Sequence, residues 1–576
     1  MTNLNWLIGG PAGAGIKVTG LILSKTFSRL GLNVFGYTEY PSLARGGHNN
    51  FNVHVSKNKK SIAKKLDVLI ALDKNTIELH KDKMSSSGII IYDPAKIENI
   101  EFPNIQTLPL PLKEVATECG SALAQNTVAL GATMALIGIE LDTLNSVIEN
   151  VFSKKAKIVD VNISAAKKGY ELVKEKNISL NCLTDELKEK IEPKLLISGN
   201  EAISLGAIQA GCKFYAAYPM TPASSILHFM AGKAREFDFI VKQTEDEIAA
   251  INATIGASYA GVRAMTATSG GGFCLMTEGL GLAAESETPI VIVNAMRPGP
   301  STGMPTWTDQ SDLRFVSHAS QGEFLSVVIA PCDMKDCFYE TMNAFNIAEN
   351  YQIPVIVLTD KLLSESYGTV DELDVNRIGI DRGVIESTTS SYGGKRYLFT
   401  DTGVSPRIIP GAVDGIHVAT GNEHDEYGEI DASSENRVKM QDKRYRKLES
   451  LQKIIPLPKV YGSESGEVGI ICWGSTKLSA LDAQEKLEKL GYNVGVVCFK
   501  YILPFPDSED VRKILKRFNK LIMVEANYTG QFLGMFRENL LIDVDDKLLK
   551  YDGRPIYPEE IVEKVKSVLS GGENNG

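Results

Sequence analysis

The sequence has few of the features that would place it in several large classes of protein. None of its eight cysteines forms a C-x-x-C pair, and the closest two, Cys332 and Cys337, lie five positions apart, a poor spacing for metal ligands. We therefore expect free, mostly buried thiols in a reducing, cytoplasmic setting. We also expect that this chain holds no metal and no iron–sulfur cluster of its own.

The chain also lacks an excess of positive charge and has no long apolar run. The formal net charge is -10 at pH 7, which argues against a nucleic acid as the main ligand but leaves small anions open. No apolar run approaches the length that crosses a membrane. The N-terminal MTNLNWLIGG has no basic segment before its apolar residues, so it predicts a first strand and not a signal peptide.

The chain does contain a regular alternation of strand-like and helix-like segments. Its 576 residues are too many for one core, and the alternation predicts α/β domains with parallel sheets and helices on both faces. We place these domains at residues 1–190, 195–385 and 461–570. Residues 386–460 lose the periodicity, so we expect an insertion there, with the charged segment KMQDKRYRKLESLQK forming a solvated helix.

Two glycine-rich loops stand out in the first domain. GGPAGAGI, residues 9–16, joins a predicted strand to a predicted helix. It suits either a phosphate site or a tight turn, and its spacing matches neither the dinucleotide nor the Walker pattern. The second loop, EYPSLARGGHNNF, contains Arg45, Gly46, Gly47 and His48. A turn explains the glycines but not the Arg and His, so we expect this loop to contact an anion or a partner.

In the second domain, Thr221 is held between two prolines. The segment FYAAYPMTPAS places Pro219 and Pro222 around Thr221, directly after a predicted strand. Proline restricts the backbone on both sides, so the Thr221 hydroxyl lies on a rigid turn at the carboxyl end of a strand, where open α/β sheets bind ligands. The alternative is that Thr221 or Ser224 caps the following helix.

Glu247 lies in the segment KQTEDEIAAI, which also allows two interpretations. With Thr244 it has the spacing of a helix capping box, a purely structural motif. Its apolar neighbours, however, would raise the pKa of the Glu247 carboxyl and keep it protonated. A protonated carboxyl can donate a hydrogen bond to a ring nitrogen.

Two more predicted strands end in residues suited to ligand binding. After RAMTAT come Ser269, Gly270 and Gly271, and the glycines leave room for a flat ligand. After PIVIVNAM comes Arg297, held by the proline that follows. Arg297 is either an exposed ion-pairing residue or a bidentate clamp for a carboxylate.

These segments, in this order, resemble the α subunit of 2-oxoacid:ferredoxin oxidoreductases, in the form with a γ domain fused at the N-terminus. YPMTPAS is similar to the family motif YPITPSS, with Met220 in place of Ile, and EDEIAAI resembles the segment with the thiamine-activating Glu. EYPSLARGGH resembles the γ-domain signature, and VEANYTGQF and YDGRPIYPEEI resemble the C-terminal domain, where ETN is usual. The resemblance implies a γ-type α/β domain, a thiamine-pyrimidine-binding parallel α/β domain and a transketolase-C-terminal-like α/β domain.

The resemblance also implies an activity and a set of site residues. The family decarboxylates a 2-oxoacid oxidatively with thiamine diphosphate, passing the acyl group to coenzyme A and electrons to ferredoxin. Glu247 would face the aminopyrimidine, and the loop of Arg45, Gly46, Gly47 and His48 would lie near coenzyme A or a partner. The remaining assignments are cofactor contacts by Pro219, Ser269, Gly270 and Gly271 and substrate contacts by Thr221, Ser224 and Arg297.

One motif of the family is absent. Its diphosphate- and Mg²⁺-binding GDG, followed by Asn, has no counterpart, since DG occurs only in VDGIH and YDGRP. The resemblance therefore implies a separate β subunit that brings the diphosphate site, the Mg²⁺ and a [4Fe–4S] cluster, in an (αβ)₂ assembly. 2-Oxoglutarate is the favoured substrate, and pyruvate or a broad range is the other option. Two alternatives stay open: a non-redox, transketolase- or decarboxylase-like thiamine subunit, and a regulatory protein that binds nucleotide or coenzyme A through GGPAGAGI.

Overall fold

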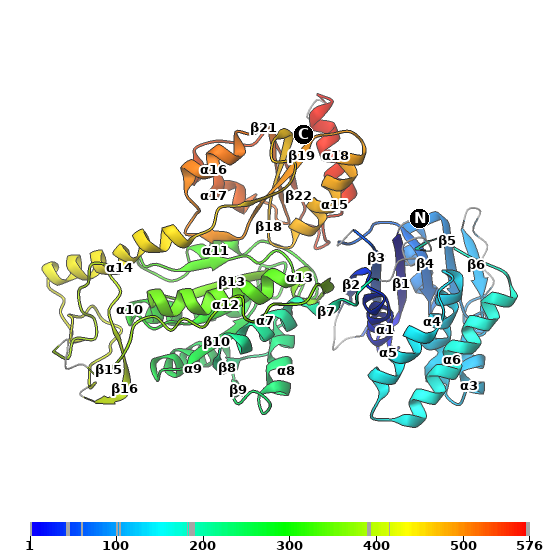
Figure 1. Cartoon of the computed structure of the whole chain (residues 1–576), viewed down its shortest axis with the longest axis horizontal. Helices are drawn as coiled ribbons and strands as arrows, with labels where there is room; N and C mark the ends of the chain where they lie inside the picture. The colour runs from blue at the N-terminus through cyan, green and yellow to red at the C-terminus, as the bar shows by residue number, and fades with distance from the viewer. Residues whose placement is uncertain are drawn as a thin grey trace. The chain divides into compact units, whose positions relative to one another are not determined.

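The chain forms two compact units in the computed structural model, which describes residues 3–41, 46–58, 61–98, 102, 105–180, 182–183, 191–388, 393–413 and 415–571. The first unit comprises Met1–Ser198, Ser366–Leu373 and Tyr557–Glu559, and the second comprises Gly199–Glu365, Asp374–Ile556 and Glu560–Gly576. Strands alternate with helices in both units, which confirms the predicted α/β class (Figure 1). The domain limits at 190, 385 and 460 stay predictions. Within the described ranges, every helix is too short or too polar to span a lipid bilayer.

The first unit is built on an eight-stranded sheet. In sheet order its strands are β6 (Gln106–Pro109), β5 (Met84–Tyr92), β4 (Leu66–Ala71), β1 (Asn3–Pro11), β3 (His48–Ser56), β2 (Asn33–Glu39), β14 (Tyr367–Val370) and β7 (Leu195–Ser198). Strands β1, β4, β5 and β6 are parallel, but β3 is antiparallel to β1 and β2. The expectation of wholly parallel sheets is therefore wrong here, because residues 40–47 between β2 and β3 are too few for a helical crossover.

Helices cover the first sheet on both faces, as its side-chain alternation requires. Trp6 and Ile8 belong to the larger core, where the Trp6 indole donates a hydrogen bond to the Thr133 hydroxyl at 3.1 Å. Leu7, pointing the opposite way, packs in a smaller cluster with Ile77. The larger core includes residues of α1 (Ile16–Arg29), α3 (Leu112–Glu118), α4 (Gln125–Leu136), α5 (Asp142–Phe152) and α6 (Ala156–Glu175), and the smaller one includes α2 (Lys74–His80).

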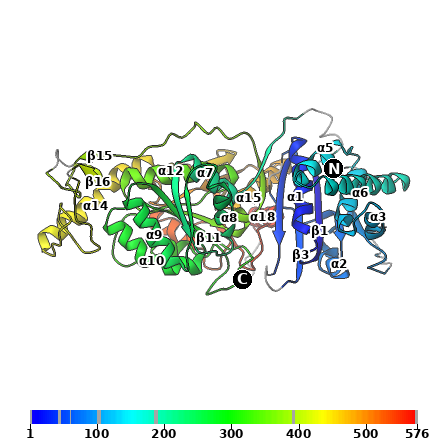
Figure 2. The same ribbon diagram turned by 90° about the horizontal axis from the view of Figure 1, so that it is seen from below.

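The second unit contains a seven-stranded sheet that is parallel except at one edge. In sheet order its strands are β20 (Tyr501–Leu503), β12 (Val327–Ile329), β13 (Val355–Asp360), β11 (Val291–Met296), β10 (Arg263–Thr268), β8 (Cys212–Ala217) and β9 (Ile240–Gln243), with only β20 antiparallel. Helices α7 (Gly199–Gln209) and α12 (Met334–Tyr351) pack together, and α9 (Glu247–Tyr259) and α10 (Gly270–Glu285) pack together elsewhere on this sheet (Figure 2). The remaining helices are α8 (Ser224–Lys233), α11 (Leu313–Ser317) and α13 (Lys361–Glu365).

A five-stranded sheet near the C-terminus shares a core with the seven-stranded one. Phe273 and Ile292 of the larger sheet's layers lie in one apolar cluster with Trp473, Phe499 and Phe532. The strands, in sheet order, are β17 (Lys459–Gly462), β19 (Val494–Phe499), β18 (Gly466–Trp473), β21 (Phe518–Glu525) and β22 (Asp546–Leu549). The helices of this part are α15 (Thr476–Lys489), α16 (Ser508–Leu515), α17 (Gln531–Leu540) and α18 (Pro558–Leu569).

The segment predicted as an irregular insertion contains two short strands and a long helix. Strands β15 (Ile385–Thr388) and β16 (Arg407–Val413) pair in parallel, and α14 (Ser434–Ile454) follows them. The expectation of a solvated helix is wrong for one face of α14, because Lys443 and Lys447 are fully buried. Both lysines bind the buried carboxylate of Glu287, which removes the need for water at their ammonium groups.

Candidate active site

Three of the predicted site segments follow neighbouring parallel strands of the second unit. Thr221 follows β8, Ser269 follows β10 and Arg297 follows β11, and these strands are adjacent in the order β11-β10-β8. Because parallel strands end at the same edge of a sheet, the three segments lie at one edge. That edge is where open α/β sheets bind their ligands.

Arg297 and Thr221 are in direct contact, but through the main-chain carbonyl of Thr221 and not through its hydroxyl. An Arg297 Nη1 hydrogen is donated to the Thr221 main-chain carbonyl at 2.7 Å. The Thr221 hydroxyl makes no hydrogen bond with any other described residue. Helix α8 begins at Ser224 after Ala223, with no capping hydrogen bond from a side chain. The interpretation of Thr221 or Ser224 as a helix cap is therefore wrong, and both hydroxyls are left for other partners.

Glu247 is the first residue of α9 and does not serve as its cap. The cap is Asp246, whose carboxylate accepts the Ala249 N–H at 2.8 Å. The predicted capping box of Thr244 and Glu247 is therefore wrong, because the cap is Asp246, two positions after Thr244. The Glu247 side chain is buried, and its nearest polar partner is the Thr268 hydroxyl, which donates to Oε1 at 3.4 Å. Burial raises the pKa of Glu247, in agreement with the argument from its apolar neighbours.

The first turn of α10 leaves space for that carboxyl. A Cβ on Gly272 would collide with the Thr268 hydroxyl and with Glu247 Oε1. A Cβ on Gly271 would have only the Ser301 carbonyl within reach, at 3.8 Å. Gly272 thus keeps the Glu247 carboxyl in place, while the surface over Gly271 is open.

This geometry predicts a large effect of one methyl group. Gly272→Ala should displace the Glu247 carboxyl, and if that carboxyl takes part in a reaction, a displacement of about 1 Å should lower the rate about 100-fold. Gly256→Ala, at an exposed position of α9 where nothing lies within 4 Å of the new Cβ, is the matched control and should leave activity unchanged. Steady-state rates and thermal unfolding of both variants are the measurement. Equal activity of the two variants would contradict the packing described here.

A cavity of about 420 Å³ opens beside these groups, a volume typical of small-molecule sites. Of the residues predicted as site residues, it is lined by Gly270, Gly271 and Arg297. Pro219, Thr221, Ser224, Glu247 and Ser269 lie around this edge of the sheet but do not line the cavity. Its other lining residues are Met220, Cys274, Gly299, Pro300, Ser301, Thr302, Asp312 and Phe315.

Among the lining residues that the sequence analysis missed, Asp312 is the one with a carboxyl group. Its position before the apolar residues of α11 is typical of a helix cap, yet its side chain makes no capping hydrogen bond. Instead the carboxyl lies against Gly270, at the start of α10, and accepts a long hydrogen bond from Asn294 Nδ2, 3.4 Å away. Burial raises the pKa of Asp312 to about 6. Only the fold brings together Asp312 and Gly270, so no local signal marked it.

The two glycine-rich loops belong to the first unit. Gly13 and Gly15 have φ angles of 86° and 76°, which favour glycine, so turn geometry accounts for both. Gly46 and Gly47 also have positive φ, at 73° and 112°. Arg45 lies outside the described residues.

His48, the first residue of β3, has a histidine partner. Its Nε2 lies 3.2 Å from His80 Nε2, and burial lowers the pKa of His80 to about 3. The pair is therefore neutral near pH 7, so it offers no positive charge to an anion. Binding of an anion or partner by this loop stays a prediction.

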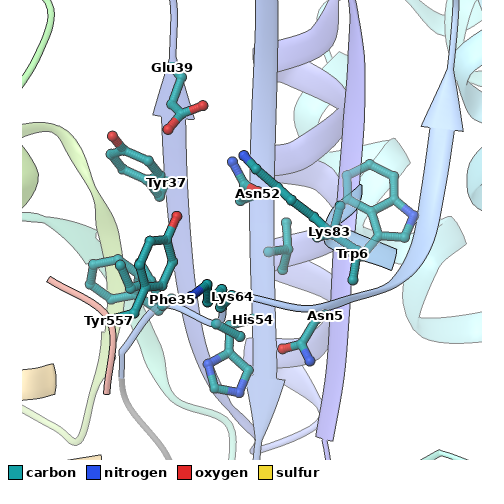
Figure 3. Close-up of a pocket in the computed structure, with 14 residues that line it drawn as sticks. Asn5, Trp6, Phe35, Tyr37, Glu39, Asn52, His54, Lys64, Lys83 and Tyr557 are labelled. Atoms are coloured by element: carbon teal, nitrogen blue, oxygen red, sulfur yellow. The ribbon is translucent and has the colours of Figure 1, made fainter. Parts of the chain in front are cut away.

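A second, much smaller cavity lies in the first unit. Tyr37, Asn52 and Asn5, from three neighbouring strands, are among its lining side chains (Figure 3). Its volume of about 20 Å³ holds one water molecule, not a cofactor. The cavity beside Arg297 is therefore the better candidate for the active site.

Known protein families match three parts of the chain. Residues 205–443 match the thiamine diphosphate-binding model of pyruvate flavodoxin/ferredoxin oxidoreductases. Residues 5–172 match the pyruvate ferredoxin/flavodoxin oxidoreductase model, and residues 466–561 match core domain II of pyruvate:ferredoxin oxidoreductase. The thiamine diphosphate-binding match includes every candidate residue of the second unit.

Individual relatives extend over the whole chain. A 2-oxoacid:ferredoxin oxidoreductase subunit alpha from Saccharolobus solfataricus is 34% identical, over 99% of this chain and 98% of its own. The 2-oxoglutarate synthase subunit KorA of Methanothermobacter marburgensis is 34% identical over 64% of this chain and 97% of its own. A solved 2-oxoglutarate:ferredoxin oxidoreductase from Magnetococcus marinus, with 2-oxoglutarate, coenzyme A and succinyl-CoA bound, covers 99% of this chain and 100% of its own at 34% identity and a TM-score of 0.90.

These matches define a thiamine diphosphate-binding oxidoreductase. The chain belongs to the 2-oxoacid:ferredoxin oxidoreductase family, as an α subunit. The resemblance predicted from the sequence is confirmed, and with it the assignment as an enzyme. Membership in this family sets aside both the non-redox thiamine enzyme and the regulatory nucleotide-binding protein.

Proposed function

We propose that this α subunit takes part in the oxidative decarboxylation of a 2-oxoacid, with transfer of the acyl group to coenzyme A and of electrons to ferredoxin. The observation that carries the proposal is the buried carboxyl of Glu247 beside an open cavity that also holds Arg297. A carboxyl with a raised pKa and an arginine at the same sheet edge suit a thiamine-dependent decarboxylation, because the first can bond to the coenzyme ring and the second to the substrate carboxylate.

The residues at this edge fit the pyrimidine half of thiamine diphosphate. Gly272 reserves the space of the Glu247 carboxyl, and the surface over Gly271 is open to a flat ring. Burial raises the pKa of Glu247 and so favours the protonated carboxyl, which donates a hydrogen bond to a ring nitrogen. Pro219, Ser269 and Gly270, at the same edge of the sheet, are proposed to contact the cofactor. Thiamine diphosphate, when bound, supplies a carbon nucleophile for the substrate carbonyl and holds the electrons left when CO₂ departs.

The substrate is held by Arg297 with the help of two hydroxyls. One N–H group of the Arg297 guanidinium is bonded to the Thr221 carbonyl. The other N–H groups are proposed to bind the substrate carboxylate. The hydroxyls of Thr221 and Ser224 bind the carboxylate and the carbonyl. This anchoring keeps the reacting carbon near Glu247 without a further charge.

A β subunit completes the site. Its role is to supply the diphosphate contacts, Mg²⁺ and a [4Fe–4S] cluster, in an (αβ)₂ assembly. Two observations support this: the chain lacks a GDG motif followed by Asn, and its relatives are named subunit alpha. Within the described ranges, the only cluster of potential metal-binding side chains is Glu285, Glu423 and His424, without a cysteine. The loop of Arg45, Gly46, Gly47 and His48 is proposed to contact coenzyme A or the partner.

2-Oxoglutarate is the favoured substrate. Support comes from the Magnetococcus marinus relative, solved with 2-oxoglutarate and succinyl-CoA, and from the KorA relative. The described lining of the cavity carries one cation, Arg297, whereas 2-oxoglutarate has two carboxylates. We therefore propose that the β subunit binds the second carboxylate.

Replacing Arg297 tests the proposal. In the complex with the β subunit, Arg297→Ala should raise KM for the 2-oxoacid at least about 30-fold, because a hydrogen-bonded charge pair is worth roughly 2–5 kcal/mol. Thr221→Ala should raise KM and lower kcat by smaller factors. The assay is the reduction of ferredoxin or a low-potential dye with pyruvate, 2-oxobutyrate and 2-oxoglutarate, in the presence of coenzyme A.

The matched control is Arg235→Ala, an exposed arginine just after α8. It should leave KM unchanged for every substrate. If KM of Arg297→Ala stays within twofold of the KM of the unmodified enzyme for all three acids, the proposed role of Arg297 as substrate clamp is contradicted.

A further inference from the structure

Asp312 has a carboxyl group in the cavity where the carboxylate of the substrate is expected to bind. The cavity would then hold two negative groups, one from the protein and one from the substrate. Both Asp312 and Arg297 line this cavity. Asp312 lies in the turn before α11, against Gly270, and Arg297 lies at the end of β11. A protein carboxylate repels an anionic substrate that binds beside it, so its charge is unfavourable there unless a positive group lies nearby.

The local contacts leave Arg297 as that partner. Asn294 donates a long hydrogen bond to Asp312 Oδ2, at 3.4 Å, and no other neutral group among the described residues is bonded to the carboxyl. The positive charge of Arg297 lowers the pKa of Asp312, opposing the larger effect of burial, and the charge of Asp312 acts in return on Arg297. The two groups form no close ion pair, so an anion can approach the guanidinium.

We propose that Asp312 is a positioning residue: its carboxylate is the counter-charge of Arg297 in the substrate-free enzyme, and the carboxylate of the 2-oxoacid takes its place while Asp312 takes up one proton from solvent. The inference rests on the proposed role of Arg297 as substrate clamp. No bond of the substrate changes in this step. One proton moves from water to a carboxylate oxygen, and the charge around the guanidinium stays constant.

Binding of the 2-oxoacid then depends on pH in a defined direction. In the free enzyme the pKa of Asp312 is about 6, and a bound carboxylate raises it further. At a pH below the pKa of the free enzyme, Asp312 is already protonated and KM does not depend on pH. Between the two values each binding event takes up a proton, so KM rises by up to about tenfold per pH unit.

Several other titratable groups face this region and must be separated from Asp312. Cys274 on α10 lines the same cavity, and its pKa is raised by burial and, to a smaller extent, by the charge of Asp312. Glu247 interacts with Arg297 from the start of α9. Asp309, in the same turn, has a pKa raised by burial to about 7 but does not line the cavity. Asp309→Asn is therefore the matched control.

The experiment compares kcat/KM for the 2-oxoacid with pH in three forms of the assembled enzyme: unmodified, Asp312→Asn and Asp309→Asn. From about pH 6 to pH 8, the unmodified enzyme and Asp309→Asn should lose kcat/KM at least about fivefold through KM. Asp312→Asn should lose this slope and have the lower KM at pH 8. An unchanged slope in Asp312→Asn overturns the inference. If Arg297→Ala has no effect on KM, the proposed clamp fails instead.

Proton uptake gives a second test that needs no variant. Calorimetry of an unreactive substrate isostere, oxamate for pyruvate or N-oxalylglycine for 2-oxoglutarate, is run at about pH 7.5 in two buffers with different ionisation enthalpies. The unmodified enzyme should take up close to one proton per isostere bound. Binding without proton uptake overturns the inference.

Discussion

Glu247→Gln should lower the 2-oxoacid-dependent reduction of ferredoxin by about 10²–10⁴-fold, the usual range for loss of a general acid–base group. Glutamine keeps the volume of the side chain and its hydrogen-bonding ability. Its amide can still bond to a ring nitrogen, but an amide N–H is far less acidic than a carboxyl O–H and polarises the ring much less than the protonated carboxyl proposed for Glu247. The measurement is kcat in the assembled complex at saturating 2-oxoacid and coenzyme A.

Glu245→Gln is the control, because Glu245 is exposed and only two positions away. It should retain full activity. Thermal unfolding of both variants shows whether the fold survives, and we expect Glu247→Gln to be at least as stable as the unmodified chain. The reason is that burial of the Glu247 carboxylate is unfavourable, as its raised pKa indicates, and a neutral glutamine avoids that cost. If Glu247→Gln keeps more than a third of the activity, the reaction does not depend on a hydrogen bond from the Glu247 carboxyl to the ring.

The sequence predicts the part of the site that lies at strand ends. Arg297, Ser269 and Thr221 each follow a run of apolar residues, and such runs mark buried parallel strands. Neighbouring strand ends then converge without further information. The pKa direction of Glu247 also follows from local sequence, since its apolar neighbours on α9 are within one helical turn.

The parts that could not be predicted depend on contacts between distant segments. Asp312 has the local pattern of a cap, and only its approach to Gly270 and Asn294 makes it a lining residue of the cavity. The strand β20 follows β19 directly but adds to the edge of the other sheet, antiparallel to β12. Neither feature has a signal in the spacing of apolar residues, because periodicity records which face is buried and not what covers it.

The helix α14 is the clearest case of this limit. Its charged sequence predicts a solvated helix, yet Lys443 and Lys447 are buried because Glu287, more than 150 positions earlier, lies between them. Burial alone would raise the pKa of Glu287, but the two ammonium groups hold it well below its usual range. Burial in turn lowers the pKa of Lys443 to about 7. The three side chains depend on one another for their charge.

Removal of the one carboxylate should therefore cost more stability than any surface change in the insertion. Glu287→Gln leaves two buried lysines without their anion, and breaking a buried ion pair in this way typically costs about 3–5 kcal/mol. Urea or thermal unfolding of the isolated chain is the measurement. Glu435→Gln, an exposed residue in the first turn of α14, is the control and should change stability by less than about 0.5 kcal/mol.

A triple variant separates charge from packing. Glu287→Gln combined with Lys443→Met and Lys447→Met removes all three charges and keeps similar volumes, so it should recover most of the lost stability. Failure of the single variant to destabilise by at least about 1 kcal/mol would mean that the cluster does not hold α14 in place. Recovery in the triple variant would show that the insertion is attached mainly by its apolar contacts. The ionic cluster would then serve to position α14 beside the end of α10, the helix whose first turn forms the active-site cavity.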